Sequence, residues 1–291
     1  MRILLTGAGG FLGRQVLALL FSNGHQIIAV SRTPDMRQAS STAGVEWILD
    51  DPGEACRRVQ GCDQVIHLAT SYGREQTAIA DLIACNVVLP AQLCEQCARM
   101  GIPFLAADTF FSRPGTRYSH LPIYSASKRA FVEIGSAIVG ERSLLAVMAI
   151  EHLYGPGDDV RKAIPMLVRR IVRQSGRIPL TDGCQQRDFI HVRDAAAAIV
   201  RLSSVAAILG KGTLRIEIGS GSPLALRDLL ELVHARSRSS TVLGFGDLPQ
   251  RLGEPESKGA DISLLRSLGW SPQIRIEQGI DEMVAEALGG N

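Results

Sequence analysis

The chain has 291 residues, of which 46% are hydrophobic, 21% charged and 5% aromatic. This composition excludes disordered, collagen-like and disulfide-dense proteins. The formal net charge is +2, from 31 Lys and Arg against 29 Asp and Glu, so we expect no nucleic-acid partner and no attraction to a membrane surface. No apolar run reaches about 18 residues, the length of a membrane span, and no signal peptide is recognisable, so a cytoplasmic protein is expected.

Short apolar runs alternate with segments of helical periodicity through the first half of the chain. Strands are predicted at 3–5, 26–30, 45–49, 64–68, 103–107 and 144–150, and helices at 11–22, 53–59, 77–100 and 124–139. Such alternation is typical of an α/β fold with a doubly wound, parallel Rossmann sheet. The entirely apolar run at 144–150 indicates a strand that is covered on both faces.

The alternation of strands and helices becomes less regular after Gly157. The later elements are helices predicted at 163–174, 194–204 and 225–236, and a strand predicted at 213–218. We therefore expect two regions in the chain. Residues 1–160 form a dinucleotide-binding Rossmann domain to which 186–212 return, and residues 161–185 with 213–291 form a smaller, discontinuous substrate-binding region.

The first predicted strand runs directly into the sequence TGAGGFLG, which opens the first predicted helix. Gly7 can make the tight turn, Gly10 leaves room for a pyrophosphate, and Gly13 lets the helix pack closely on the strand. The helix begins with Phe11 and Leu12, and a helix N-terminus presents free N–H groups to an anion. Because the motif lies between a strand and a helix at the start of a βαβ pattern, it predicts dinucleotide binding rather than a merely structural turn.

The residues after the second predicted strand bear on the choice between NAD and NADP. An acidic residue there would grip the ribose hydroxyls of NAD, but the sequence has Ser31 and Arg32. A guanidinium can fork onto a ribose 2′-phosphate, so NADP(H) is favoured over NAD(H), with a solvated loop charge as the alternative for Arg32. Asp50 and Asp51 follow the next strand, where they either accept from the adenine amino group through one of the pair or cap the following helix.

Tyr124 and Lys128 form a Y-x-x-x-K motif at the start of a predicted helix, and the i,i+4 spacing puts both side chains on one face. A phenol with an ordinary pKa of about 10 is a poor base at neutral pH. Lowering that pKa by about three units needs roughly 4 kcal/mol of preferential stabilisation of the phenolate. A Lys ammonium and a cationic nicotinamide ring can supply it, and Tyr124 can then exchange a proton with a carbinol or ketone oxygen. The alternative is an ordinary pair at the edge of an amphipathic helix.

Cys94 and Cys97 form a C-x-x-C motif, which suggests a redox pair or half of a metal site. The motif lies inside the predicted helix 77–100, and neither a second C-x-x-C nor a spaced pair of histidines completes four ligands. We therefore expect two core residues of a helix, reduced thiols in the chain, and no metal.

Several motifs in a fixed order make the chain resemble the extended short-chain dehydrogenase/reductase family, in particular its NAD-dependent epimerase/dehydratase group, which acts on nucleotide sugars. Besides the glycine motif and the Tyr–Lys pair, the resemblance rests on Asn86, VIHLAT at 65–70, LYGPGD at 153–158, RDFIHV at 187–192 with Asp194, IGSG at 218–221 and LGW at 268–270. It covers almost the whole chain, and ordered motifs are far more specific than any single one.

The resemblance assigns roles to further residues. Thr109 occupies the place of the family's active-site Ser or Thr, whose hydroxyl hydrogen-bonds the reacting sugar oxygen, and Lys128 would also hold the nicotinamide ribose. Leu68, Ala69 and Thr70, at the end of the fourth predicted strand, are expected to lie against the cofactor.

Two departures from the family pattern narrow the resemblance. Dehydratases of the family place Asp-Glu directly after the active-site Thr, whereas Phe110 and Phe111 follow here, so dehydration lacks its acid and its base. The common segment Arg-x-x-Asn-x-Tyr-Gly is replaced by one that carries Glu151 and His152. These two strings most resemble the CDP-abequose and CDP-paratose synthase branch, whose enzymes reduce a nucleotide-linked 4-keto-6-deoxyhexose with NADPH.

The expected substrate-binding residues are Phe110, His152, Arg187 and Arg251. His152 is either a substrate ligand in place of the family's Asn or a buried, hydrogen-bonded histidine at a strand end. Arg187 and Arg251 match family positions that hold the substrate diphosphate, and a planar fork suits paired phosphate oxygens. For Arg251 a role outside the site stays open.

The expected function is that of a homodimeric, NADP-dependent oxidoreductase that reduces a 4-keto group of a nucleotide-activated sugar. A nucleotide-sugar 4-epimerase with tightly held NAD is the first alternative. A catalytically idle dinucleotide sensor or scaffold on the same fold is the second. An intact Thr109, Tyr124 and Lys128 argue against a sensor, because a sensor needs only the glycine turn.

Overall fold

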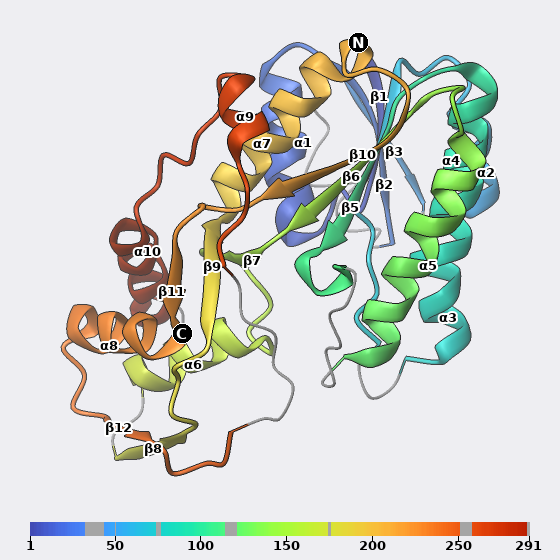
Figure 1. Ribbon diagram of the computed structural model, residues 1–291. Coiled ribbons are helices and arrows are strands. Elements are labelled where there is room, and N and C mark those ends of the chain that lie inside the picture. The colour runs from blue at the N-terminus through green and yellow to red at the C-terminus, as the bar shows by residue number, and fades with distance from the viewer. Residues whose placement is uncertain are drawn as a thin grey trace.

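The computed structural model describes residues 1–32, 44–49, 51–73, 77–113, 121–173, 176–250 and 258–289. A parallel sheet of seven strands forms its centre, in the order β10-β6-β5-β4-β1-β2-β3 (Figure 1). The strands are β1 (Arg2–Thr6), β2 (Gln26–Ser31), β3 (Val45–Leu49), β4 (Gln64–His67), β5 (Phe104–Thr109), β6 (Leu144–Ile150) and β10 (Gly212–Ile218). The doubly wound Rossmann sheet predicted from the sequence is confirmed.

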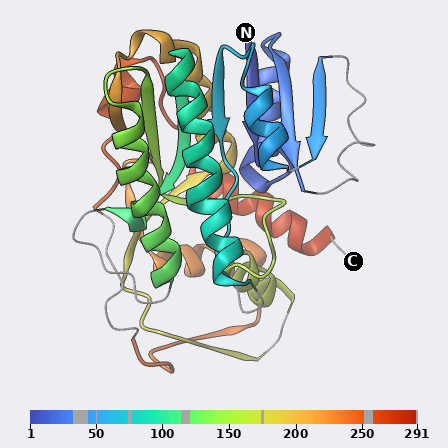
Figure 2. The same ribbon diagram turned by 90° about the vertical axis from the view of Figure 1, so that its right-hand side faces the viewer.

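Helices cover both faces of this sheet, which is why its central strands, such as β1 and β6, are mostly apolar and buried. Successive residues of β1 alternate between the two faces: Ile3 and Leu5 pack in one core cluster and Leu4 in the other. The helices that cover the sheet are α1 (Phe11–Ser22) and α7 (Val192–Val205) on one face, and α2 (Pro52–Arg58), α4 (Leu89–Met100) and α5 (Pro122–Val139) on the other. Figure 2 shows α4 and α5 lying side by side along the sheet.

The single helix predicted at 77–100 is interrupted. It consists of α3 (Ile79–Ile83), a π-helical turn η2 (Ala84–Val88) and α4. Pro90 has no N–H to donate to the carbonyl four residues earlier, that of Asn86, so a regular α-helix loses a hydrogen bond at this point. A π-helical turn is a common solution to such a break and often marks a functional site.

The second half of the chain builds a smaller lobe around a third core cluster. Its strands are β7 (His152–Tyr154), β9 (Gln186–His191) and β11 (Pro223–Ala225), which form one sheet, and β8 (Arg177–Leu180) and β12 (Val242–Phe245), which form another. Its core-forming helices are α6 (Ala163–Arg173), α8 (Leu226–Ser237) and α10 (Ile276–Gly289). Short elements complete the fold: η3 (Phe110–Ser112), η4 (Ala206–Ile208) and α9 (Ser263–Ser267).

Two boundaries of the expected regions need correction. The sequence placed 213–218 in the substrate-binding region, but β10 pairs in parallel with β6 along its whole length and is the edge of the large sheet. Its Ile216 and Ile218 are buried in the core cluster of that sheet. We also expected all of 186–212 to return to the Rossmann domain. Only part of this range does so: α7 packs against α1, whereas β9 pairs with β7 and β11 in the smaller lobe.

The described part of the chain contains no helix that is both long and apolar enough to span a membrane.

Candidate active site

A cavity of about 540 Å³ opens where the large sheet meets the smaller lobe, beyond the carboxyl ends of its parallel strands. Ligands of open α/β folds bind at this edge. The sequence-predicted residues that line it are Gly7, Gly10, Phe11, Leu12, Gly13, Ser31, Arg32, Leu68, Ala69, Thr70, Thr109, Phe110, Tyr124, Lys128 and His152. The structure therefore brings the expected cofactor-binding residues and the expected catalytic residues into one cavity. The role of each residue stays a prediction.

The glycine turn between β1 and α1 leaves no room for side chains at two of its glycines, Gly7 and Gly13. Gly7 has a positive φ of 70°, and a Cβ on it would lie 2.6 Å from the backbone nitrogen of Ala69. A Cβ on Gly13 would lie 2.0 Å from the carbonyl oxygen of Gly7. Gly10 is the N-cap of α1, where no side chain caps the helix and no acidic residue lies in the first turn. The free amides of that turn therefore fit an anion such as a dinucleotide diphosphate.

The residues that bear on cofactor choice lie at the far end of β2. Ser31 is nearly buried at the end of the strand, and Arg32 is exposed and borders the cavity. Asp51 accepts a hydrogen bond from the Glu54 amide at 2.8 Å and caps α2, so the capping alternative holds for this residue. Asp50 lies outside the described residues.

Tyr124 and Lys128 lie in the first turns of α5 and are both buried. Lys128 Nζ donates to Thr70 Oγ1 at 2.8 Å and to the Ala107 carbonyl at 3.0 Å. These bonds fix the ammonium between the ends of β4 and β5. The phenol of Tyr124 is hydrogen-bonded to the side chain of Thr109. All three expected catalytic residues line the same cavity.

Burial raises the pKa of Tyr124 well above that of a free phenol, and the neighbouring Tyr72 and Asp108 raise it further. The hydrogen bond to Thr109 acts in the opposite direction. Burial also lowers the pKa of Lys128, an effect that Asp108 partly opposes. The sequence argument expected a lowered pKa for Tyr124 with a cationic nicotinamide beside it. Without that cation desolvation dominates, and Tyr124 is a neutral phenol ready to donate a proton.

Asn86 holds the loop after β4 against α5. Its Oδ1 accepts from the Ser71 amide at 2.8 Å, and its Nδ2 donates to the Ser71 carbonyl at 2.7 Å and to Ser127 Oγ at 3.0 Å. Ser71 follows Thr70, the residue that accepts from Lys128. The π-helical turn thus presents Asn86 as a positioning residue for the Tyr–Lys group, a role the sequence did not reveal.

An aromatic wall faces this group. The ring of His152 lies 4.6 Å from that of Phe110, 5.5 Å from that of Phe111 and 5.8 Å from that of Phe189, between centroids. Burial lowers the pKa of His152 to about 3, and the charge of Arg187 acts in the same direction. His152 is therefore neutral, and its buried Nδ1 has no hydrogen-bond partner. An unpaired buried atom does not decide between a substrate ligand and a structural histidine, so the role of His152 stays a prediction.

Arg187 is buried on β9, where its Nη1 donates to the Gln186 carbonyl at 2.8 Å. It is not among the residues that line the described cavity, although its charge reaches His152. The expected contact with a substrate diphosphate therefore stays a prediction. Arg251 lies outside the described residues.

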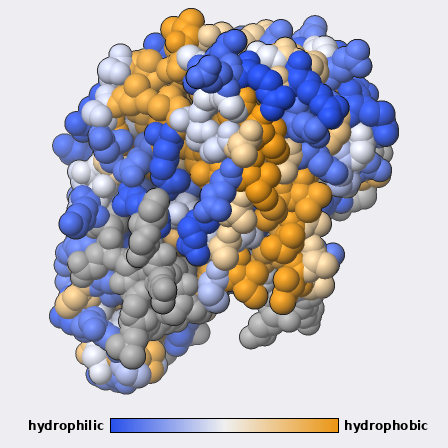
Figure 3. Space-filling model, turned by 45° about the vertical axis from the view of Figure 1, so that its right-hand side comes forward, coloured by the Kyte–Doolittle hydropathy of each residue, from blue (hydrophilic) through white to orange (hydrophobic). Residues whose placement is uncertain are grey.

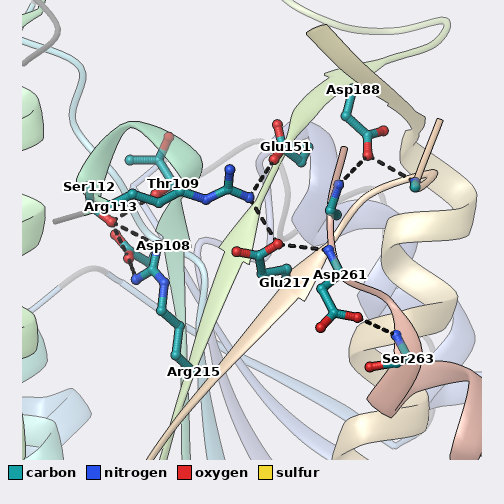
Figure 4. A network of polar contacts seen from close by, with 12 residues as sticks. Asp108, Thr109, Ser112, Arg113, Glu151, Asp188, Arg215, Glu217, Asp261 and Ser263 are labelled. Carbon is teal, nitrogen blue, oxygen red and sulfur yellow. Dashed lines mark hydrogen bonds and ion pairs between the residues drawn. The ribbon is translucent and has the colours of Figure 1, made fainter. Parts of the chain in front are cut away.

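Two buried carboxylates in the cavity wall are neutralised by arginines that come from elsewhere in the fold (Figure 4). Asp108 pairs with Arg215 of β10 at 2.7 Å. Glu151 pairs with Arg113 at 3.0 Å, and the same guanidinium reaches Glu217 at 2.9 Å. These pairings depend on tertiary structure and leave no signal in the sequence. Asp188, also in Figure 4, accepts from the amides of Ser220, Gly221 and Ala260 and holds the turn after β10.

Cys94 and Cys97 pack inside the core on α4. Both are free and fully buried, and burial raises the pKa of the Cys94 thiol to about 12. The interpretation as core residues of a helix is confirmed.

A doubly wound parallel sheet, a glycine turn at its first strand–helix junction and a buried Tyr–Lys pair, with the tyrosine bonded to Thr109, together define a short-chain dehydrogenase/reductase of the extended type. The chain belongs to the NAD dependent epimerase/dehydratase family, whose sequence profile matches residues 3–216. It is therefore an NAD(P)-dependent enzyme.

Named relatives agree with this assignment. CDP-abequose synthase of Salmonella muenchen is 31% identical over 288 residues, which cover 98% of this chain and 97% of the relative. CDP-abequose synthase of Salmonella typhimurium is 29% identical over 290 residues, which cover 97% of each protein. The crystal structure of UDP-glucuronic acid 4-epimerase from Bacillus cereus, in complex with UDP-glucuronic acid and NAD, has a TM-score of 0.81 at 22% identity over 99% of both chains. The similarity to the CDP-abequose synthase branch that the sequence motifs indicated is confirmed.

Proposed function

We propose that the protein is an NADP-dependent reductase of a nucleotide-activated sugar, and that it reduces the 4-keto group of a 4-keto-6-deoxyhexose. One observation carries the proposal: the cavity contains a protonated Tyr124 hydrogen-bonded to Thr109 and close to Lys128, while the carboxylates Asp108 and Glu151 in the cavity wall are paired with arginines. Such a site can give a proton to a ketone oxygen but offers no free carboxylate for elimination.

The cavity offers candidate contacts for the diphosphate and for the 2′-phosphate of the cofactor. The glycine turn would receive its diphosphate, Leu68 to Thr70 would lie along it, and Arg32 would fork onto a 2′-phosphate. NADP(H) is favoured and NAD(H) is the alternative. When bound, the reduced nicotinamide supplies the hydride.

The residues of this chain donate the proton and orient the substrate. Tyr124 donates its phenolic proton to the sugar carbonyl oxygen as that oxygen becomes an alcohol, and Thr109 orients the same oxygen through its hydroxyl. The Lys128 ammonium, fixed by Thr70 and Ala107, then stabilises the phenolate that remains. Water restores the proton to Tyr124 after turnover.

The cavity wall favours a deoxygenated sugar. Phe110 and Phe111 stand where dehydratases of the family carry Asp and Glu, and they present apolar surface to the substrate beside a neutral His152. An apolar wall suits the methyl group of a 6-deoxyhexose better than a hydroxymethyl group. The full-length similarity to two CDP-abequose synthases supports the same substrate class.

The proposal is tested by NADPH consumption across a small panel of nucleotide-linked 4-keto sugars. We expect stoichiometric consumption with a 4-keto-6-deoxyhexose. We also expect protein purified without added nucleotide to be largely free of dinucleotide, because a reductase exchanges its cofactor every cycle. A preparation that carries NAD⁺ and interconverts two nucleotide sugars without net change in reduced nicotinamide would establish the 4-epimerase instead.

We also propose that the protein is a homodimer. Large apolar side chains are exposed along α3, η2 and α5, and the hydrophobic area on the right of Figure 3 lies over these helices. They are Ile79, Ile83, Val88, Ile123 and Ile134. Exposed apolar side chains on these three neighbouring elements suit an isologous contact with a second copy, and the mass in solution tests it.

A further inference from the structure

Lys162 lies in the cavity wall at the junction between the two lobes, directly before α6. Its Nζ is 5.5 Å from the ring centroid of Phe11 and 5.5 Å from that of Tyr72. Phe11 is the first residue of α1, and the ring of Tyr72 lies 5.0 Å from that of Tyr124. An ammonium from the smaller lobe is thus held between the glycine turn and the Tyr–Lys group.

A single buried carboxylate balances this ammonium. Asp158 Oδ1 is 2.7 Å from Lys162 Nζ and also accepts from the Asp159 amide at 2.8 Å. The Asp158 side chain is 2% exposed and lines the same cavity, whereas that of Lys162 is 29% exposed. The ammonium therefore keeps freedom to turn about its four-carbon stem while its partner is fixed.

The surroundings of Lys162 carry an excess of positive potential. The N-terminus of α1 has neither a capping side chain nor an acidic residue in its first turn, and such a helix end carries about half a positive charge. Asp158 offsets one charge, that of the ammonium itself. A second anion on the helix end would attract both groups, and the diphosphate of a dinucleotide carries about two negative charges at that place.

The backbone that carries Lys162 is already fixed to the cofactor side. Arg14 of α1 donates to the Gly157 carbonyl at 3.0 Å, and the Gly157 amide donates to Glu286 at 2.9 Å. These bonds tie the segment that leads to Lys162 to α1, and Lys162 Nζ is 5.5 Å from the ring centroid of Phe11, the first residue of that helix.

We propose that Lys162 is a further cofactor-binding residue, whose ammonium turns from Asp158 to the diphosphate of the bound dinucleotide. This inference rests on the proposed function, since it assumes that the glycine turn holds a dinucleotide. It differs from the role of Arg32 in a measurable way: the diphosphate is common to NADPH and NADH, whereas the 2′-phosphate belongs to NADPH alone. The contact also joins the smaller lobe to the cofactor.

The test compares Lys162→Met with Arg161→Met. Met keeps the apolar stem between the two rings and removes the charge. Arg161 is the matched control, because its side chain is 75% exposed, pairs with Asp159 and does not line the described cavity. Dissociation constants are measured for NADPH, NADH and adenosine 2′-monophosphate, which has no diphosphate, and circular dichroism verifies the fold of each variant.

We expect Lys162→Met to weaken NADPH and NADH alike by about tenfold, as for one charge-assisted hydrogen bond, and to leave adenosine 2′-monophosphate unchanged. Arg161→Met should leave all three unchanged, and Lys162→Arg should keep most of the affinity. Unchanged dinucleotide binding in Lys162→Met, or equal losses in both Met variants, overturns the role of Lys162 alone. Wild-type protein that binds neither dinucleotide overturns the proposed function and this inference together.

Discussion

Arg32 decides the cofactor in this account, because it borders the cavity where NAD-binding proteins of this fold carry an acid. Arg32→Ala should weaken NADPH by about 10- to 100-fold, the value of a charged hydrogen bond of about 1.5–3 kcal/mol, and leave NADH unchanged. Titration of protein fluorescence with each cofactor measures this. Equal losses for both cofactors, or a wild-type preference for NADH, would contradict the NADP assignment.

In the proposed reaction, Tyr124 donates the proton to the sugar carbonyl oxygen. Tyr124→Phe removes one oxygen and keeps the ring against Tyr72, so the fold and NADPH binding should persist while kcat falls by about 10²–10⁴. Tyr154→Phe is the matched control, because Tyr154 is equally buried but belongs to the core of the smaller lobe. Full activity in Tyr124→Phe would move the proton transfer to Thr109.

At the scale of elements, the π-helical turn η2 supports the site through Asn86. Asn86→Ala leaves the Ser71 amide and carbonyl without their partner, which should lower the free energy of unfolding by about 1–3 kcal/mol. The loop that carries Thr70 should then loosen and kcat should fall further than NADPH affinity. Urea unfolding and steady-state kinetics measure the two effects.

Asn23→Ala, at the exposed end of α1, is the control for that change. Should Asn86→Ala lose stability but retain full kcat, the loop after β4 would be a structural element without influence on the Tyr–Lys group.

The elements of the large sheet could be predicted because strands covered on both faces are apolar throughout, as in β6. Strands of the smaller lobe were not predicted: β7 and β11 have three residues each, and β9 carries Arg187 and Asp188 among its apolar residues. The helix α10 was also missed, although Ile280, Met283, Val284 and Ala287 follow the spacing of a helical apolar face. That signal was in the sequence.

The candidate site also contains some residues that the sequence indicates and others that only the fold reveals. The glycine turn and the Tyr–Lys pair are local motifs, with fixed spacing along one element each, and the sequence alone indicates them. Lys162, Asp108 and Asn86 act through partners that are remote in sequence or through an irregular helix. No local pattern encodes such contacts, so they emerge only from the fold.

At the scale of the whole molecule, histidines whose pKa is lowered by burial make stability depend on pH; they include His67, His152 and His191. Burial lowers the pKa of His67 and of His152 to about 3 in the folded protein, from an ordinary value of 6.5. As pH falls below about 6.5 the unfolded chain takes up protons that the folded chain refuses. Each histidine then costs about 1.4 kcal/mol of unfolding free energy per pH unit, until the folded pKa is reached.

We therefore expect His67 and His152 together to lower the stability of the protein by about 2 kcal/mol between pH 6.5 and 5.5, measured by urea unfolding at both values. His152→Phe, which fits the surrounding aromatic rings, should remove about half of that slope. An identical slope in the variant would show that His152 is not held neutral in the folded protein.

In the proposed reaction, hydride passes from NADPH to C4 of a nucleotide-linked sugar while Tyr124 supplies the proton. The direct measurement uses NADPH with deuterium at the reactive position of the nicotinamide and a nucleotide-linked 4-keto-6-deoxyhexose, and follows the product by mass spectrometry and NMR. The account predicts one deuterium at C4 of the sugar for each NADPH consumed. Conversion of the nucleotide sugar without NADPH consumption, and without deuterium in the product, would contradict it.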